Sequence, residues 1–336
     1  MQNPLVSIIV PTYNRLHRLP ETLNSVFAQT HKNLECLVVD DGSTDDTFAF
    51  LANLAGTETR IRFFRRPADR LKGANACRNF GFEQSEGEYI LFLDSDDVLA
   101  PTCIEERLQY LRDENADFVV ANTSSFVNKT FLDKVVNIDP VVNAPDKYLS
   151  LFLSYQLPWT IMSSLWKREV VKTIAFDEEL KRFQDVDFHI RVLLNGSFKF
   201  KRLKKIDNYY RWSGKTKQNN KEFNRAVADS FLELLRKLTK TEELSPQYYN
   251  SLKRFIYVIS KDFIYFTEDI DLDYARAFNK EIKQFDFFDL KDRSIFKVMW
   301  IYSKFGMYGK GGTGGYRFSK RADAYYDSLS IAHIND

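Results

Sequence analysis

The stretch YILFLDSDD, residues 89–97, is decisive for the fold and raises a question about function. Its first five residues are apolar or aromatic, as in a strand buried on both faces, and three carboxylates follow within four positions. Asp94, Asp96 and Asp97 repel one another at a strand end, and each charge raises the pKa of its neighbours. A cationic group is therefore expected beside them.

The composition describes a globular chain with room for two domains, or for one large domain with an extension. Its 336 residues are 44% hydrophobic and 28% charged. A net charge of +2 argues against nucleic acid as a partner, because polyanion binders rely on bulk positive charge. Cys36, Cys77 and Cys103 are an odd number spread along the chain, which indicates a reducing compartment, the cytoplasm, rather than a disulfide framework.

Strand and helix patterns alternate through the first hundred residues. Short β-branched or aromatic runs predict strands, and segments with apolar residues at helical spacing predict the helices between them. The expected strands are residues 6–10, 34–40, 61–66 and 89–94, and the expected helices are residues 18–30, 48–55 and 73–85. This order predicts an α/β fold with a mostly parallel sheet flanked by helices, whose ligands bind beyond the carboxyl ends of the strands.

Polar and acidic clusters follow three of these strands: PTYNR at 11–15, DDGSTDD at 40–46 and DSDD at 94–97. Asp94 and Asp96 are two residues apart, so at an extended chain end they point the same way. Mg²⁺ or Mn²⁺ commonly takes one or two carboxylates and completes its shell with phosphates and water. The alternative for this cluster is a cap, with Asp97 opening the next helix.

Taken together, VSIIVPTYNR, LECLVVDDGSTDDT, GANACRNFG and GEYILFLDSDDVLAP resemble the successive motifs of family-2 glycosyltransferases with the GT-A fold. The resemblance covers about the first hundred residues and resumes more weakly at residues 163–196. It implies an inverting, metal-dependent enzyme that moves a sugar from a nucleotide donor, favoured to be a UDP-sugar, to a hydroxyl of a glycan or lipid-linked glycan. Bacterial surface polysaccharide synthesis is the implied setting.

The resemblance assigns the donor site residue by residue. Pro11, Thr12 and Tyr13 match the loop that holds the base, where Tyr13 offers an aromatic face. Asp41 matches the carboxylate that reads the edge of the base. Arg78 matches a basic position near the nucleotide, with a structural pairing to Asp41 as the alternative.

The metal and the catalytic base are also implied by the resemblance. Asp94 and Asp96 match the ends of the DxD motif, with Asp96 as a ligand of Mn²⁺ or Mg²⁺ and Asp94 bound to ribose or metal. Asp185 matches the general base of inverting members. Spacing alone allows Asp185 to be the N-cap of the following helix instead. Asp187 is expected to face another side of that helix.

Acceptor or diphosphate contacts are expected further along the chain. Residues 197–220 hold eight Lys and Arg against one Asp, which is typical of a solvated strand face or of a clamp on an anion. Arg211 and Ser213 are the candidates for such a clamp. Trp159 is a candidate for stacking on an acceptor sugar, with a place in the core as the alternative.

Three parts follow from these patterns: a donor-binding half at residues 1–100, an acceptor-binding and catalytic half at 101–218, and a helical C-terminal extension at 219–336. Residues 223–238, 248–266 and 294–306 have apolar positions at helical spacing. The mixture of aromatic residues and Lys in this extension suits a peripheral contact with the inner face of a membrane, a homodimer interface, or packing on the catalytic domain.

Two other functions remain compatible with the sequence. A sugar nucleotidyltransferase also combines a nucleotide-binding α/β sheet with acidic metal ligands, but the Gly- and Arg-rich loop typical of that class is absent after residues 6–10. A non-catalytic module that binds nucleotide sugars or glycans needs the sheet and no base. Binding without turnover across a panel of donors and acceptors would favour the module.

Overall fold

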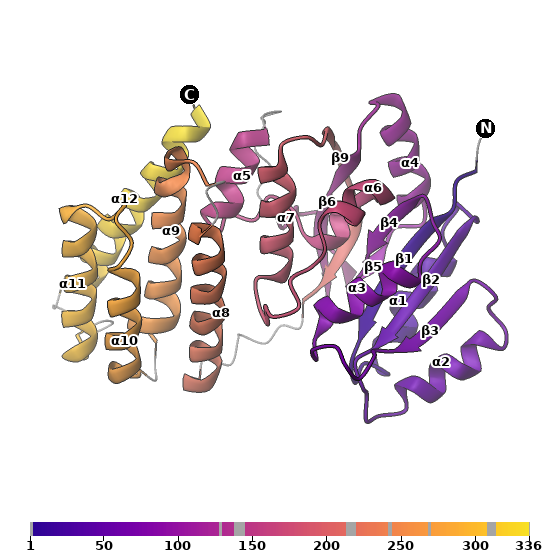
Figure 1. The fold of residues 1–336 in the computed structure, drawn as a ribbon, viewed down its shortest axis with the longest axis horizontal. Coiled ribbons are helices and arrows are strands. Elements are labelled where there is room, and N and C mark those ends of the chain that lie inside the picture. The colour runs from indigo at the N-terminus through magenta and orange to yellow at the C-terminus, as the bar shows by residue number, and fades with distance from the viewer. Residues whose placement is uncertain are drawn as a thin grey trace. The chain divides into compact units, whose positions relative to one another are not determined.

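The computed structural model describes residues 3–127, 130–137, 145–212, 220–240, 244–267, 270–307 and 314–335. The chain divides into two compact units. The first, the sheet unit, comprises Met1–Asn143 and Leu157–Gly214, and the second, the helical unit, comprises Ala144–Gln156 and Lys215–Asp336. Among the described residues, every strand belongs to the sheet unit (Figure 1).

One mixed sheet runs through the sheet unit, with the strand order β3-β2-β1-β4-β8-β6-β9-β5 and β7 paired to β6. β1 is parallel to β2 and β4, β2 to β3, and β6 to β9, whereas β8 is antiparallel to β4 and β6. The strands are β1 (Val6–Thr12), β2 (Leu34–Asp40), β3 (Ile61–Arg65), β4 (Tyr89–Phe92), β5 (Val98–Leu99), β6 (Phe118–Val127), β7 (Thr130–Phe131), β8 (Ser164–Lys167) and β9 (Phe200–Arg211).

Helices cover both faces of this sheet. Alternate residues of β1 point to opposite faces, so both sets of side chains are buried. Ile8 and Val10 belong to a core cluster that also contains buried residues of α1 and α4. Ile9 points the other way, toward α3, where an added Cβ on Gly81 would lie 2.6 Å from Ile9 Cγ2. The helices are α1 (Leu19–Phe27), α2 (Thr47–Ala55), α3 (Ala74–Gln84), α4 (Cys103–Asp113), α6 (Arg168–Thr173) and α7 (Gln184–Asn195), with a 3₁₀ turn, η1 (Ile161–Ser163).

The register of the parallel strands brings the predicted motifs level with one another. Thr12, the last residue of β1, lies opposite Asp40, the last residue of β2. Ile9 lies opposite Phe92 at the end of β4, so the DSDD segment leaves the sheet beside the loop after β1. The predicted mostly parallel sheet with flanking helices is therefore confirmed, and the polar clusters share its carboxyl edge.

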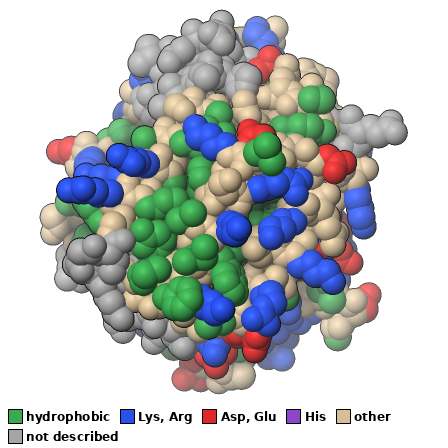
Figure 2. All heavy atoms as spheres, turned by 90° about the vertical axis from the view of Figure 1, so that its left-hand side faces the viewer, with side chains coloured by type: hydrophobic (Ala, Val, Ile, Leu, Met, Phe, Trp, Pro, Cys, Tyr) green, Lys and Arg blue, Asp and Glu red, His purple; other side chains and the backbone are tan. Residues whose placement is uncertain are grey.

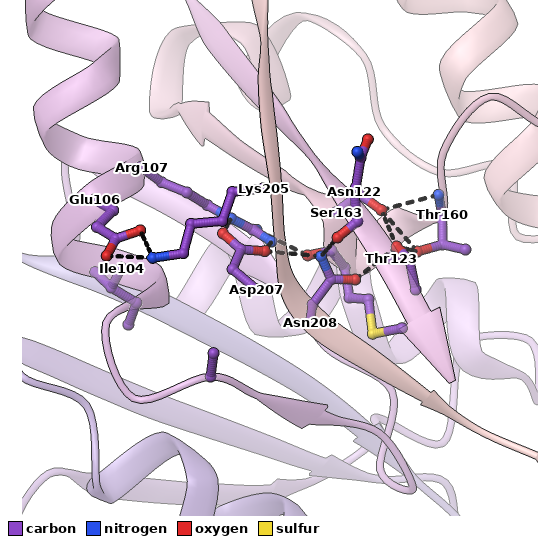
Figure 3. A network of polar contacts seen from close by, with 12 residues as sticks. Ile104, Glu106, Arg107, Asn122, Thr123, Thr160, Ser163, Lys205, Asp207 and Asn208 are labelled. Carbon is purple, nitrogen blue, oxygen red and sulfur yellow. Dashed lines mark hydrogen bonds and ion pairs between the residues drawn. The ribbon is translucent and has the colours of Figure 1, made fainter. Parts of the chain in front are cut away.

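A buried polar network fixes the second half of the sheet (Figure 3). Arg107 of α4 donates from Nε and Nη2 to the two carboxylate oxygens of Asp207 on β9, at 2.8 and 2.6 Å, and both side chains have no exposed surface. Asn208 Nδ2 donates to Asp207 Oδ1 at 2.9 Å, and Thr123 Oγ1 of β6 donates to Asn208 Oδ1 at 2.7 Å. Because each member satisfies its neighbour, the network holds α4, β6 and β9 in one arrangement.

The helical unit is built from amphipathic helices, as predicted for residues 223–238, 248–266 and 294–306. Arg254 of α9 donates to the carbonyl of Ser154 at 2.6 Å, which ties α5 into this unit. No helix in the described part of the chain is long and apolar enough to cross a membrane. The helices are α5 (Pro145–Leu153), α8 (Lys221–Lys240), η2 (Pro246–Tyr248), α9 (Tyr249–Ile259), a π-helix at Ser260–Tyr265, α10 (Leu272–Ile282), α11 (Leu290–Lys304) and α12 (Gly315–Asn335).

Candidate active site

A cavity of about 330 Å³ lies at the carboxyl ends of β1, β2 and β4. Seven residues expected from the sequence to bind nucleotide or metal line it together: Pro11, Thr12, Tyr13, Asp41, Arg78, Asp94 and Asp96. Five further residues complete the lining: Arg15, Ala74, Cys77, Ser95 and Gln184. The structure therefore collects residues from four separate sequence motifs around one space.

The loops after β1 and β2 hold each other in place. Asn14 lies at φ 51°, in the left-handed region that Asn tolerates better than most residues. Its Oδ1 accepts from the backbone N–H of Thr44 at 2.7 Å, and its own N–H donates to Ser43 Oγ at 2.9 Å. The adjacent Tyr13 ring is 41% exposed, with Lys72 Nζ 4.1 Å from its centroid. An aromatic surface with a cation beside it thus lies at the rim of the cavity.

Asp41 is a buried carboxylate with a fixed orientation. Its Oδ1 accepts from Arg66 Nε at 2.6 Å and from the backbone N–H of Gly73 at 3.2 Å. Arg66, and not Arg78, is therefore its structural partner, which corrects the alternative considered for Arg78. An anchored carboxylate of this kind can accept hydrogen bonds from a ligand without first reorganising.

Arg78 links the acidic cluster to the start of α7. Its Nη2 donates to Asp94 Oδ1 at 2.7 Å, and its Nη1 donates to Asn75 Oδ1 and Gln184 Oε1, both at 3.2 Å. The Arg78 side chain is nearly buried, whereas Asp94 is 41% exposed to the cavity. Gln184 immediately precedes Asp185, so Arg78 joins the two segments that carry the expected metal ligand and the expected base.

Arginines supply the positive charge that the DSDD segment was expected to need. Asp96 Oδ2 pairs with Arg18 Nη1 at 2.8 Å and lies 3.8 Å from Arg15 Nη2. Asp97 is buried, and its Oδ1 accepts from the backbone N–H of Arg211 at 2.8 Å. Burial raises the pKa of Asp97 well above its usual range, and the charges of Asp94 and Asp96 raise it further. The repulsion expected in this cluster is therefore evident at Asp97.

Asp97 does not cap the following helix, which corrects the alternative considered for this cluster. The short strand β5 comes directly after it, and α4 begins only at Cys103, with Thr102 as the residue before it. Asp97 instead ties the chain to β9 through the Arg211 backbone.

The chemistry of the cavity fits a hard divalent cation that is shared with a diphosphate. Asp94 and Asp96 both line the cavity, and oxygen ligands of this kind suit Mg²⁺ and Mn²⁺. Within the described residues, no three His, Cys, Asp or Glu side chains converge into a self-sufficient metal cage. A cation here would therefore depend on a ligand for the rest of its shell, as nucleotide-bound Mg²⁺ does.

Asp185 is the second residue of α7, and Phe183 takes the N-cap position at φ 58°. This corrects the alternative that made Asp185 the cap. Its Oδ1 accepts from the backbone N–H of Val186 at 3.0 Å. Burial raises the pKa of Asp185, the nearby charge of Asp94 adds to the rise, and the Arg78 guanidinium opposes it. Asp185 is therefore a carboxylate with enhanced basicity, electrostatically coupled to the cavity residues.

Asp187 has a different environment from Asp185, as the helical spacing predicted. It is 3% exposed, and its Oδ2 accepts from Nε and Nη2 of Arg191 at 2.9 and 2.5 Å, one turn along the same helix. An acid held in this way is occupied by a structural ion pair.

Like Asp185, the expected contact residues Trp159 and Arg211 are not among the residues that line the cavity. Trp159 is 1% exposed and packs against His189 and Phe200, with ring centroids 5.7 and 5.5 Å away. The Arg211 guanidinium donates to the Asp96 carbonyl at 2.7 Å and pairs with Glu21 at 2.5 Å. Ser213 lies outside the described residues.

Sequence reasoning missed several polar groups of the site. Arg15, Arg18 and Arg66 each reach a carboxylate from another segment. Gln184 has no role in the sequence analysis, and its position directly before Asp185 is the signal that points to it.

Comparison with known proteins decides the family. The sequence model of glycosyl transferase family 2 matches residues 7–168. A UDP-Glc:alpha-D-GlcNAc-diphosphoundecaprenol beta-1,3-glucosyltransferase of Escherichia coli, WfaP, is 31% identical over 210 residues, which cover 62% of this chain and 77% of that protein. The chain belongs to glycosyl transferase family 2.

Other family-2 relatives are longer than the matched region. An uncharacterized glycosyltransferase of Rickettsia felis is 42% identical over 119 residues, which cover 35% of this chain and 19% of that protein. The match to this relative thus spans about a fifth of its length.

Solved structures share the fold. TarS of S. aureus has a TM-score of 0.62 at 18% identity, with 89% of this chain and 52% of that chain covered. A mannosyltransferase of Pyrobaculum calidifontis, in complex with GDP-Man and Mn2+, has a TM-score of 0.53 at 15% identity and covers 99% of this chain and 88% of that chain. The GT-A architecture expected from the sequence is confirmed.

Proposed function

We propose that this family-2 chain transfers a glucosyl residue from UDP-glucose to a hydroxyl of a lipid-linked glycan, with inversion and with the help of a divalent cation, in bacterial surface glycan synthesis. The observation that carries the proposal is one cavity, at the carboxyl ends of β1, β2 and β4 and beside α3, that all seven expected donor and metal residues line. WfaP, WfgD and a Campylobacter jejuni relative are named as beta-1,3-glucosyltransferases acting on undecaprenol-linked acceptors.

The cavity offers the groups that a uridine diphosphate needs. The exposed face of Tyr13 can stack on the base, and the fixed carboxylate of Asp41 can accept from an N–H at the base edge. Arg78 and Arg15 place positive charge on the cavity wall, where the diphosphate oxygens would gain charge-assisted hydrogen bonds. The donor is thus recognised by stacking, by one anchored acceptor and by arginines.

Asp96, with Asp94, would hold Mn²⁺ or Mg²⁺ against the diphosphate. When bound, such a cation neutralises charge that develops on the departing nucleotide. Arg15 and Arg18, which surround Asp96, add positive charge at the same place. The mannosyltransferase complex with Mn2+ supports a cation in this fold.

Asp185 is the proposed general base. It would take the proton from the attacking acceptor hydroxyl while the new bond forms between that oxygen and the anomeric carbon, and the bond from this carbon to the diphosphate oxygen breaks. The raised pKa of Asp185 suits this role, because a more basic carboxylate is a better proton acceptor. Since UDP-glucose carries its sugar in α linkage, attack from the opposite face gives a β product.

Transfer with a defined acceptor tests the proposal. The purified chain is incubated with Mn²⁺, α-GlcNAc-diphosphoundecaprenol and, separately, UDP-glucose, UDP-GlcNAc or GDP-mannose. We expect release of UDP from UDP-glucose that depends on the acceptor, and a β-linked product by NMR. The matched control is the same reaction with free GlcNAc, which lacks the diphosphate lipid.

A different experimental result would contradict each part of the proposal. Preference for GDP-mannose would refute the donor assignment, and an α-linked product would refute inversion. Donor binding without turnover across the whole panel would favour the non-catalytic module.

A further inference from the structure

Helices α11 and α12 of the helical unit carry more basic than acidic side chains. Together they carry seven basic and three acidic side chains, against a net charge of +2 for the whole protein. All seven basic side chains are exposed to solvent: Lys291, Arg293, Lys297, Lys304, Arg317, Lys320 and Arg321.

The three acidic side chains are instead all engaged in ion pairs within the helical unit. Each is neutralised by a basic residue of α9 or of the π-helix that continues it: Asp292 by Lys253 at 2.7 Å, Asp323 by Lys261 at 2.7 Å and Asp327 by Arg254 at 2.8 Å. Asp292 has no exposed surface and also accepts from the Tyr326 hydroxyl at 3.0 Å. The outward surface of the two helices therefore carries positive charge that their own acids do not offset.

An exposed apolar stripe lies among these cations. The buried side of α11 contains Phe296 and Met299. Leu290, at the start of the helix, is 83% exposed, and Phe305, directly after its last residue, is 62% exposed. At the start of α12, Tyr316 is 71% exposed. Figure 2 shows this face of the molecule, with a hydrophobic area bordered by Lys and Arg side chains.

Lysine side chains extend along the aromatic rings of this surface. Lys304 Nζ lies 5.1 Å from the Trp300 ring centroid and 5.6 Å from that of Phe305, and Lys320 Nζ lies 5.0 Å from that of Tyr316. Such side chains keep the ammonium group in water while their methylene stems cover apolar surface. Aromatic and aliphatic side chains beside Lys are the combination that suits the boundary between water and lipid.

We propose that the outward face of α11 and the start of α12, from Leu290 to Phe305 with Tyr316 and Lys320, docks on a bilayer surface that carries anionic phospholipids. The apolar stripe would enter the headgroup boundary, and the seven cations would face lipid phosphates. A second copy of the chain is the poorer partner, because a two-fold symmetric contact would place this positive surface against itself. The inference is independent of the transferase activity.

Vesicle binding by the full chain tests this docking surface, with neither donor nor acceptor present. We expect the protein to sediment with vesicles of 70% phosphatidylcholine and 30% phosphatidylglycerol at low salt, and to remain free with pure phosphatidylcholine. The triple variant Lys297→Gln, Lys304→Gln, Lys320→Gln should bind about a hundredfold more weakly, because each basic residue near an anionic surface contributes about fivefold. The double variant Leu290→Ser, Phe305→Ser should lose about tenfold or more.

A matched control separates the proposed surface from overall charge. The variant Lys172→Gln, Lys181→Gln, Lys204→Gln removes three exposed cations from the sheet unit, so its net charge equals that of the first triple variant. It should bind vesicles like the wild type. Equal losses in the two triple variants, or no preference of the wild type for anionic vesicles, would overturn the proposal. So would a wild-type dimer in analytical ultracentrifugation that Leu290→Ser, Phe305→Ser dissociates.

Discussion

Replacing Asp185 with Asn tests the proposed mechanism most directly. The amide is nearly isosteric with the carboxylate and can still accept from the Val186 N–H, so the start of α7 should keep its geometry. The amide cannot take a proton from an acceptor hydroxyl. We therefore expect kcat to fall by about 10² to 10⁴-fold, the usual loss for a general base, which corresponds to about 2.7 to 5.4 kcal/mol of transition-state stabilisation.

The structure also predicts what Asp185→Asn leaves intact. Asp185 is not among the residues that line the cavity, so its replacement leaves the expected donor-binding side chains in place. Nucleotide affinity, measured by isothermal titration with UDP, should stay close to that of the wild type. A large loss of affinity would show that Asp185 builds the donor site, and a variant with normal kcat would place the base elsewhere.

The pH dependence of kcat supplies a second readout. A base works only when ionised, so wild-type kcat should fall as the pH drops through the pKa of Asp185. An ordinary Asp titrates near pH 4. Because the pKa of Asp185 is raised, the fall in kcat should begin at a higher pH than that. This acid limb should be absent from the residual activity of Asp185→Asn. The control Asp187→Asn weakens the ion pair with Arg191, so it should lower thermal stability and keep the limb.

Three further predictions concern the metal, the polar network and the division into units. Asp96→Asn should abolish the dependence of UDP binding on Mn²⁺ or Mg²⁺, and a normal, metal-stimulated transfer rate in this variant would show that the metal assignment is wrong. Arg107→Met leaves the carboxylate of Asp207 buried and unpaired, so urea unfolding should show a loss of about 3–5 kcal/mol, and a loss below about 1 kcal/mol would contradict the burial argument. A chain cut after Gly214 keeps α5 but loses α9 and α12, on which α5 packs. We therefore expect this shortened chain to be soluble and to bind UDP only when residues 145–153 are replaced by a polar linker. Soluble protein that binds UDP without the replacement would contradict this expectation.

The donor half of the site was accessible from the sequence because its signals are local. Each of the three loops directly follows a buried strand, and parallel strands bring their carboxyl ends to one edge. Tyr13, Asp41 and Asp94 could therefore be placed at one rim without knowledge of any side-chain contact. The resemblance to family-2 enzymes then supplied their roles.

The partners of these residues depend on tertiary structure. Arg18 meets Asp96 across 78 positions of sequence, and the Arg211 backbone meets Asp97 across 114. Ion pairs of this kind carry no periodic signal, because any exposed arginine on a neighbouring segment could supply the charge. The two-residue strand β5 is equally invisible to pattern analysis, which is why Asp97 looked like a helix cap.

The start of α7 shows a different limit. Phe183 has a positive φ, a conformation that is uncommon for a bulky residue, so Asp185 was the more natural cap. Placing the cap two residues earlier makes Asp185 part of the first turn. Its raised pKa comes from burial and from Asp94, and neither could be known from spacing.

The fully buried pair of Arg107 and Asp207 has a consequence for how this fold can diverge. Losing either partner strands the other charge in the core, whereas an apolar pair of similar volume can be neutral or even stabilising. A chain in which only Arg107 or only Asp207 has been replaced should therefore fold poorly. Descendants of this chain should exchange the two positions together, or not at all.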